Sequence, residues 1–221
     1  MSLKVHNPRW TRVDRYLEDR LEPDPILDAA VKASSAAGLP DIAVTPSQGK
    51  FLHLLARMQA ARRILEIGTL GGYSTIWLAR ALPADGHLVT LEFDEKHLNV
   101  ARDNIARAGL SPLVEHRLGP ALQTLPQLTG PFDFIFIDAD KENAAAYFEW
   151  SVRLSRPGTA IVVDNVIRDG EVADPKSADP RVQGIRRLNE MIAAEPRVSA
   201  TTLQTVGSKG YDGFTLALVN N

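Results

Sequence analysis

Acidic and amide side chains follow two apolar segments of the chain. Asp138 and Asp140 come directly after or close behind the run FDFIFI, and Asp164 and Asn165 come directly after AIVV. If the two runs form neighbouring parallel strands, their carboxyl ends meet at one edge of a sheet, where open α/β sheets bind ligands. Carboxylate and amide oxygens suit Mg²⁺ or Ca²⁺. Asp138, Asp164 and Asn165 are therefore candidate ligands of a divalent cation; the alternative is that Asp164 and Asn165 cap a loop or helix.

A glycine-rich turn offers a second kind of chemistry. The segment EIGTLGGYS contains Gly68 and follows another apolar run, and glycine allows the backbone to approach a ligand closely. Glu92 ends the next apolar run, where a carboxylate can accept hydrogen bonds from both hydroxyls of an adenosine ribose. Each feature alone is more often structural, a simple turn or a solvated acid. Together they favour a nucleoside cofactor, although the turn lacks the G-x-G-x-x-G of dinucleotide sites.

Short apolar runs alternate with helical patterns from Arg63 onward. Five candidate parallel strands are the runs RRILEIG, HLVTLEF, LVEHRL, FDFIFIDAD and TAIVVDN. Helices are expected over 74–82, 95–108 and 141–154, with a short turn near 121–125. This alternation predicts right-handed crossovers and a doubly wound sheet.

The last third of the chain departs from this alternation. A polar loop over 167–179 and a helix over 180–194 precede two further strands, 199–204 and 214–219. The glycine-rich connection VGSKGYDG is too short for a helical crossover, so it predicts an antiparallel hairpin. The sequence therefore predicts an α/β fold with a Rossmann-like, doubly wound, seven-stranded sheet that is mostly parallel.

Residues 1–60 are expected to be helical, so that 1–221 forms a single domain with its Rossmann-like core at 61–221. Thr45 with Gln48 three residues later has the form of a capping box, and Asp24 before Pro25 resembles another helix start. Two sets of apolar residues recur at helical spacing. They are Val13, Tyr16, Leu17 and Leu21 in the first helix, and Phe51, Leu54, Leu55 and Met58 in the third.

Composition narrows the function classes. The formal net charge of the 221 residues is −2, without the basic stripe that would neutralise phosphates, so no nucleic-acid partner is expected. The chain has no cysteine, which excludes disulfides and thiolate chemistry and agrees with a reducing compartment such as the cytoplasm. The five histidines lack zinc-ligand spacing. Neither a signal-peptide pattern nor an apolar run of about 20 residues is present, so no membrane association is expected.

The strings LEIGTLGGYS, GPAL, FIDADK, VVDNV and KGYDGF, in this order, resemble the cation-dependent O-methyltransferases, the class I family of catechol and caffeoyl-CoA O-methyltransferases. The resemblance covers roughly residues 40–219. It implies S-adenosylmethionine as cofactor and a set of residues that contact it: Val44, Glu66, Gly68, Thr69, Ser74, Glu92, Ala121 and Asp138.

The same resemblance implies that Asp138, Asp164 and Asn165 bind a divalent cation. Mg²⁺ is the first choice, with Ca²⁺ or Mn²⁺ as alternatives. It also implies that Lys141, three residues after Asp138, is the catalytic base, and that the chain pairs as a homodimer. The segments before Thr45 and over 172–178 lie outside the minimal sheet and could supply that interface.

The expected activity is methyl transfer to a hydroxyl of a small aromatic acceptor. Relatives that bind flat aromatics often carry N-V-L-W where this chain has NVIR, so the identity of the acceptor stays open. A nicotinamide-dependent oxidoreductase is the first alternative, opposed by the missing fingerprint and by the hairpin. A catalytically inactive cofactor-binding protein is another, opposed by the intact acid, amide and lysine set. The N-P-P-Y or D-P-P-Y strings of nucleic-acid and amine methyltransferases and the G-x-S-x-G of serine hydrolases are absent.

Overall fold

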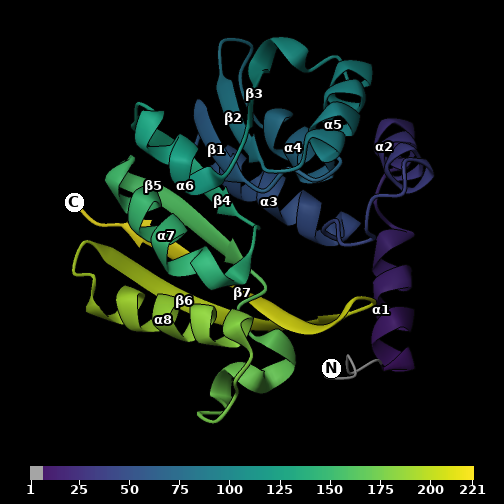
Figure 1. Cartoon of the computed structure of the whole chain (residues 1–221). Helices are drawn as coiled ribbons and strands as arrows, with labels where there is room; N and C mark the ends of the chain where they lie inside the picture. Colours follow the sequence, from purple (N-terminus) through teal and green to yellow (C-terminus); the bar gives the residue numbers. More distant parts are fainter. Residues whose placement is uncertain (1–6) are drawn as a thin grey trace.

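A seven-stranded sheet organises residues 7–221, the part of the chain that the computed structural model describes (Figure 1). Its strand order is β3-β2-β1-β4-β5-β7-β6. Neighbouring strands are parallel except at β5–β7 and β6–β7, which are antiparallel. The strands are β1 (Arg63–Ile67), β2 (His87–Glu92), β3 (Val114–Leu118), β4 (Phe132–Ile137), β5 (Ser155–Asp164), β6 (Val198–Gly207) and β7 (Gly210–Val219). The predicted doubly wound sheet with a terminal antiparallel hairpin is confirmed.

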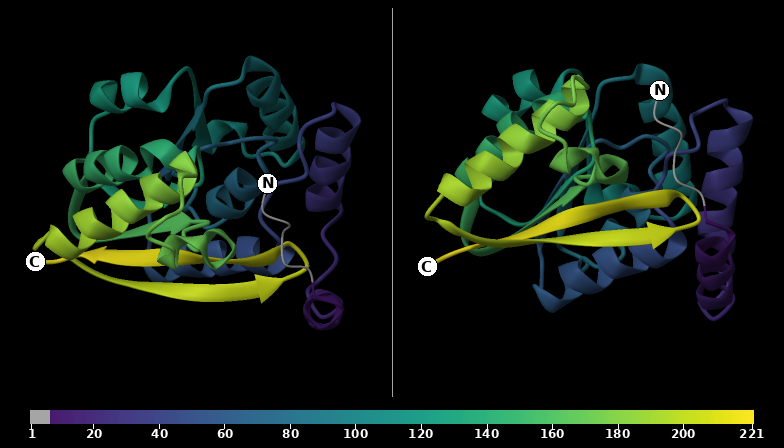
Figure 2. Two further views of the ribbon diagram at one scale, coloured as in Figure 1. Left: turned by 60° about the horizontal axis from the view of Figure 1, so that its bottom comes forward. Right: turned by 90° about the horizontal axis from the view of Figure 1, so that it is seen from below.

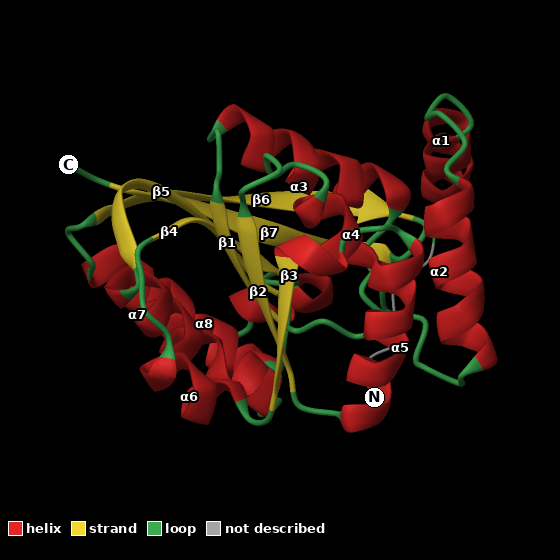
Figure 3. Cartoon of the chain, turned by 90° about the horizontal axis from the view of Figure 1, so that it is seen from above, coloured by secondary structure: helices red, strands yellow, loops and turns green. Residues whose placement is uncertain are grey.

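Helices cover both faces of this sheet (Figure 3). One face packs against α2 (Pro25–Ala36), α3 (Pro46–Met58), α4 (Tyr73–Ala79) and α5 (Glu95–Arg107). The other packs against α6 (Ala121–Thr124), α7 (Ala144–Arg153) and α8 (Pro180–Ala194). Because both faces are buried, the central strands are continuously apolar, and successive residues such as Phe134 and Ile135 enter opposite clusters.

Short 3₁₀ segments complete the chain: η1 (Ser111–Leu113), η2 (Leu125–Gln127), η3 (Lys141–Asn143) and η4 (Arg168–Ala173). The predicted helix over 141–154 is thus divided, since η3 precedes α7. The predicted polar loop over 167–179 contains η4, whose turns are separated by left-handed residues at Asp169 and Gly170. Within residues 7–221, no helix has both the length and the apolar character needed to cross a membrane.

The predicted caps at Asp24 and Thr45 begin α2 and α3. Asp24 accepts hydrogen bonds from the amides of Ile26 and Leu27, and Thr45 accepts one from the Gln48 amide at 3.2 Å. The side chain of Gln48 does not close a capping box, however. Its Nε2 donates to Oδ2 of Asp164 at 2.7 Å, so it joins α3 to the end of β5.

The buried face of α3 differs from the predicted apolar set. Gly49, Leu52, His53 and Ala56 are buried, whereas Leu54 and Met58 are 46% and 81% exposed. The reason is the close contact at Gly49, where a Cβ would lie 2.3 Å from Cδ1 of Trp77 on α4. The helix therefore turns its small residues toward α4 and leaves two of its larger side chains outside.

The first helix, α1 (Pro8–Glu18), ends before Leu21 and has no buried residue. Val13, Tyr16 and Leu17 do share it, but they remain about half exposed. The helix is held instead by Asp14, whose Oδ2 accepts the amide of Ser208 at 2.6 Å. Figure 2 shows the β6–β7 hairpin reaching past the helical layers to α1.

The hairpin turn is tighter than predicted. Pairing continues to Gly207 opposite Gly210, so only Ser208 and Lys209 form the turn. Gly213 lies within the ladder, where a Cβ would come 2.2 Å from the carbonyl oxygen of Leu203. The glycines therefore permit close strand packing as well as the turn itself.

Candidate functional site

Backbone hydrogen bonds fix the loops at the carboxyl ends of the parallel strands. The amide of Gly68 donates to the carbonyl of Leu91, and that of Asp138 donates to Ile67, at 3.0 and 2.9 Å. The amide of Gly119 donates to the carbonyl of Glu92 at 2.8 Å. These bonds bring the loops that follow β1, β2, β3 and β4 together along one sheet edge, as the alternation of strands and helices predicts.

Glu92 holds the turn after β1 through both of its carboxylate oxygens. Oε2 accepts the amides of Thr69 at 3.1 Å and Leu70 at 2.7 Å. Oε1 accepts the amides of Phe93 and Asp94, each at 3.0 Å. Glu92 is only 9% exposed, so it is not a solvated strand-end acid. Because its four lone-pair positions are occupied, a ribose diol here must share or replace some of these bonds.

Glu66 lies fully buried beneath the same turn. Its carboxylate accepts hydrogen bonds from the hydroxyls of Ser74 at 2.7 Å, Thr75 at 2.5 Å and Thr90 at 2.7 Å. Burial raises the pKa of Glu66 to about 7, against the lowering effect of the three hydroxyl bonds. The hydroxyls of Thr69 and Thr90 lie 2.6 Å apart and extend this network to the turn.

Gly68 connects the turn to the acidic segment after β4. Its φ of 99° is left-handed, and a Cβ at this position would lie 2.2 Å from the carbonyl oxygen of Asp138. Any side chain would therefore push the two loops apart. The glycine that the sequence associated with ligand approach is required first by the neighbouring loop.

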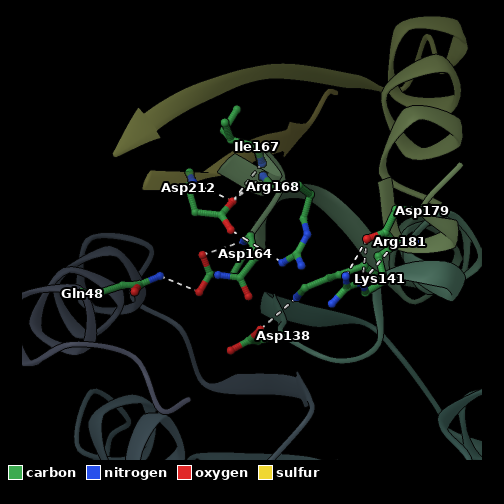
Figure 4. Close-up of polar contacts among 11 residues, drawn as sticks. Gln48, Asp138, Lys141, Asp164, Ile167, Arg168, Asp179, Arg181 and Asp212 are labelled. Atoms are coloured by element: carbon green, nitrogen blue, oxygen red, sulfur yellow. Dashed lines mark hydrogen bonds and ion pairs between the residues drawn. The ribbon is translucent and has the colours of Figure 1, made fainter. Parts of the chain in front are cut away.

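Asp138, Lys141 and Asp164 are the charged residues that follow β4 and end β5 in the site (Figure 4). Nζ of Lys141 donates to Oδ1 of Asp138 at 2.9 Å, and the lysine is buried. Asp164 is 4% exposed and accepts the Asn165 amide at 2.8 Å in addition to Gln48. Burial, together with the negative charge of Asp138, raises the pKa of Asp164 above its ordinary range.

The donor set fits a hard cation. Two carboxylates lie close enough for Asp138 to disfavour ionisation of Asp164, although Lys141 partly offsets this effect. Asn165, the third predicted ligand, directly follows Asp164 and has a left-handed φ of 57°. No cluster of three or more His, Cys, Asp or Glu suited to a metal occurs within residues 7–221. A cation here would thus rely on few protein ligands and keep positions for water or substrate, as Mg²⁺ does.

Two further predicted cofactor residues lie at different depths. Ala121 begins α6 two positions after Gly119, beside the end of β2, and is partly exposed. Val44 is buried in the cluster on the α3–α4 face, immediately before the cap residue Thr45. Hydrogen bonds thus join Glu66, Thr69, Ser74 and Glu92 to one another, whereas Val44 reaches this region only by apolar packing.

Three residues of the site were missed by sequence reasoning. Gln48 was assigned to a cap, yet it binds Asp164. Asp212 accepts the amides of Ile167, Arg168 and Gly213 at 2.9, 3.1 and 3.0 Å and so holds the loop after Asn165. Gly184 on α8 allows the helix to contact η3, since a Cβ would lie 2.1 Å from the Lys141 carbonyl oxygen. Asp212 lay within the predicted glycine-rich turn VGSKGYDG, which gave it no role of its own.

Comparison with known proteins gives consistent matches over nearly the whole chain. The sequence model of the O-methyltransferase family matches residues 18–219. A catechol O-methyltransferase from Niastella koreensis is 56% identical over 221 residues, covering 97% of this chain and 100% of the relative.

Two solved structures closely match the fold of this chain. The O-methyltransferase from Bacillus cereus in complex with SAH is 62% identical, with a TM-score of 0.94 and coverage of 96% and 99% of the two chains. An O-methyltransferase of tomaymycin synthesis from Streptomyces achromogenes, in complex with SAM, is 53% identical, with a TM-score of 0.93 and coverage of 96% and 98%.

Proposed function

Since the chain belongs to the O-methyltransferase family and is an S-adenosylmethionine-dependent O-methyltransferase, we propose that its acceptor is a small aromatic hydroxyl compound, a vicinal diphenol of catechol type. The name of the Niastella relative supports this substrate class. The structural observation that supports methyl transfer at this sheet edge is the contact at Gly68, because it places the turn held by Glu92 directly against the Asp138 loop.

The proposed cofactor residues divide into three roles. Glu92 binds the ribose hydroxyls, and Glu66 with Ser74 supports the turn from below; Val44, Gly68, Thr69, Ala121 and Asp138 complete the lining. S-adenosylmethionine supplies a methyl group activated on a sulfonium, so the protein must bring the acceptor oxygen into line with it and remove a proton. The four amide bonds to Glu92 support a preformed turn, and the ribose hydroxyls would share or replace some of these bonds when the cofactor binds.

We also propose that Asp138, Asp164 and Asn165 hold a divalent cation, Mg²⁺ in the first place. Such a cation lowers the pKa of a coordinated hydroxyl and orients two vicinal oxygens. The raised pKa of Asp164 beside Asp138 supports this assignment, because an added positive charge relieves the repulsion of the pair.

Lys141 is the proposed base. In its neutral form the amine accepts the proton of the attacked hydroxyl, and Asp138 orients it through the 2.9 Å contact. Its buried side chain at the start of η3 supports this role, because water has little access to the amine.

Three wider features belong to the same proposal. The half-exposed apolar residues Val13, Tyr16 and Leu17 on α1 support a homodimer that would cover them, and light scattering that finds only monomer at micromolar concentration would contradict it.

Residues 1–221 are proposed as one domain, supported by the contacts of the hairpin turn with Asp14 and Ala43. The lack of cysteine supports a cytoplasmic location.

A turnover screen tests the proposed acceptor. Labelled S-adenosylmethionine is incubated with the protein and Mg²⁺ over a panel of catechols, together with monophenols and aliphatic diols as controls. We expect labelled methyl ether from the catechols alone. Transfer to the controls but not to the catechols would overturn the vicinal-diphenol assignment.

A further inference from the structure

Arg168 lies at the acceptor side of the site. It follows Asn165 by three residues in the loop after β5 and has a left-handed φ of 56°, followed by Asp169 with φ of 57°. Two successive non-glycine residues in this region are costly, and such strain persists where the surroundings hold it. Asp212 supplies that restraint through the amides of Ile167 and Arg168. Figure 4 shows the Arg168 side chain reaching from this loop toward Asp164 and Lys141.

The guanidinium of Arg168 lacks a hydrogen-bond acceptor within residues 7–221. Its side chain is only 22% exposed, and its ion pair with Oδ2 of Asp212 spans 3.7 Å, which is too long for a hydrogen bond. Its Nε is buried without a partner. A guanidinium has five N–H donors, and leaving them unsatisfied in a partly buried place costs free energy.

The neighbouring cations in Figure 4 are already paired. Lys141 donates to Asp138 at 2.9 Å. The side chain of Arg181 donates to Asp179 through Nη2 at 2.5 Å and through Nε at 3.0 and 3.2 Å. Asp179 also feels the positive charge of Arg168, but its carboxylate is engaged by Arg181. Arg168 is therefore the cation of this group that is best able to bind an added anion.

We propose that Arg168 binds an anionic substituent of the acceptor, a carboxylate on the ring or side chain of the diphenol. This inference rests on the proposed function. The planar fork of a guanidinium matches a carboxylate in two parallel hydrogen bonds. Arg168 thus selects dihydroxybenzoates and related aromatic acids over neutral catechols.

The test compares 3,4-dihydroxybenzoate with catechol in the wild type and in Arg168→Met, with Mg²⁺ and S-adenosylmethionine present. We expect the wild type to have the lower KM for the acid. In Arg168→Met the KM for the acid should rise roughly 10- to 100-fold through loss of a charged hydrogen-bonded pair, while kcat/KM for catechol changes less than about 3-fold. Arg168→Lys should recover part of the loss.

Arg181→Met is the matched control, because it removes a paired arginine from the same region and should leave the ratio of the two KM values unchanged. Calorimetry of 3,4-dihydroxybenzoate with the protein, Mg²⁺ and S-adenosylhomocysteine gives a readout independent of turnover and should show the same loss of affinity in Arg168→Met. If Arg168→Met loses activity equally on the two acceptors, or loses none, the role of Arg168 is overturned but the proposed acceptor class is not. Failure of the wild type to methylate either compound overturns the proposed acceptor class and this inference with it.

Discussion

The two halves of the site differ in how their charges are satisfied. On the turn after β1, Glu92 and Glu66 have every carboxylate oxygen bonded to backbone amides or hydroxyls. In the loops after β4 and β5, Asp164 faces the like charge of Asp138, and Arg168 lacks a hydrogen-bond acceptor among the described residues. The first half has its acids fully hydrogen-bonded within the protein, whereas the second keeps two neighbouring acids and an arginine without a hydrogen-bond acceptor among the described residues.

This difference suggests that the first half serves cofactor binding and the second half serves methyl transfer. A saturated network of local bonds is rigid without a ligand and favours a preorganised cofactor turn. Two neighbouring acids and an arginine without a hydrogen-bond acceptor, held at fixed positions, favour a cation and an anionic or ionisable acceptor. Changes in the first half should therefore alter cofactor affinity, and changes in the second should alter turnover while cofactor affinity is kept.

The largest effect is expected from Lys141→Met. Removing the proposed base should lower kcat by about 10²–10⁴-fold, and S-adenosylhomocysteine affinity should stay within a few-fold of wild type. Single-turnover kinetics and calorimetry measure the two quantities. Lys176→Met, in the surface loop before α8, is the control. A Lys141→Met protein with near-normal kcat would leave the base to another group.

Glu92→Ala should produce an intermediate effect in the opposite half. Loss of charged hydrogen bonds to the ribose should weaken S-adenosylhomocysteine binding by about 1–3 kcal/mol, whereas kcat at saturating cofactor should change less. Calorimetry gives the affinity, and Glu95→Ala, an exposed acid on α5, serves as control. A large fall in kcat at full saturation, with affinity intact, would contradict the division between the halves.

The last effect, on stability alone, is expected from the buried acid below the turn. The pKa of Glu66 is raised to about 7, so the folded state favours the neutral carboxyl, and this contribution to stability is lost as pH rises from the unfolded value near 4.5 through 7. Between pH 5 and 8, Glu66→Gln should gain about 1–3 kcal/mol in unfolding free energy relative to wild type. Denaturant titrations at both pH values measure it. A difference between the two proteins that does not change with pH would contradict the raised pKa.

The sheet could be predicted because its strands carry their own signal. The run FDFIFI, for example, is apolar at every position except Asp133. Strands that are buried on both faces of a sheet need this continuous apolar pattern. Once the strands were predicted, their carboxyl ends were predicted too, and these place Asp138 and Asp164 at one edge of the sheet. Polar caps at Asp24 and Thr45 were equally local.

Contacts between distant segments could not be predicted in the same way. Gln48 binds Asp164 across 116 positions, and Asp212 binds Arg168 across 44. The buried face of α3 was also missed, because Gly49 packs on Trp77 only once α4 is in place. Side-chain partners of this kind depend on tertiary packing, which periodicity does not describe.

Removal of divalent metal tests the central claim most directly, that the acceptor half is completed by a cation. Protein stripped with a chelator is assayed for methyl transfer to catechol and, by calorimetry, for S-adenosylhomocysteine binding, before and after Mg²⁺ is restored. We expect turnover to be lost and then regained with Mg²⁺, while cofactor binding stays nearly unchanged, and Asp164→Ala should resist restoration. Full turnover by the stripped protein, or a fully active Asp164→Ala variant, would contradict the claim.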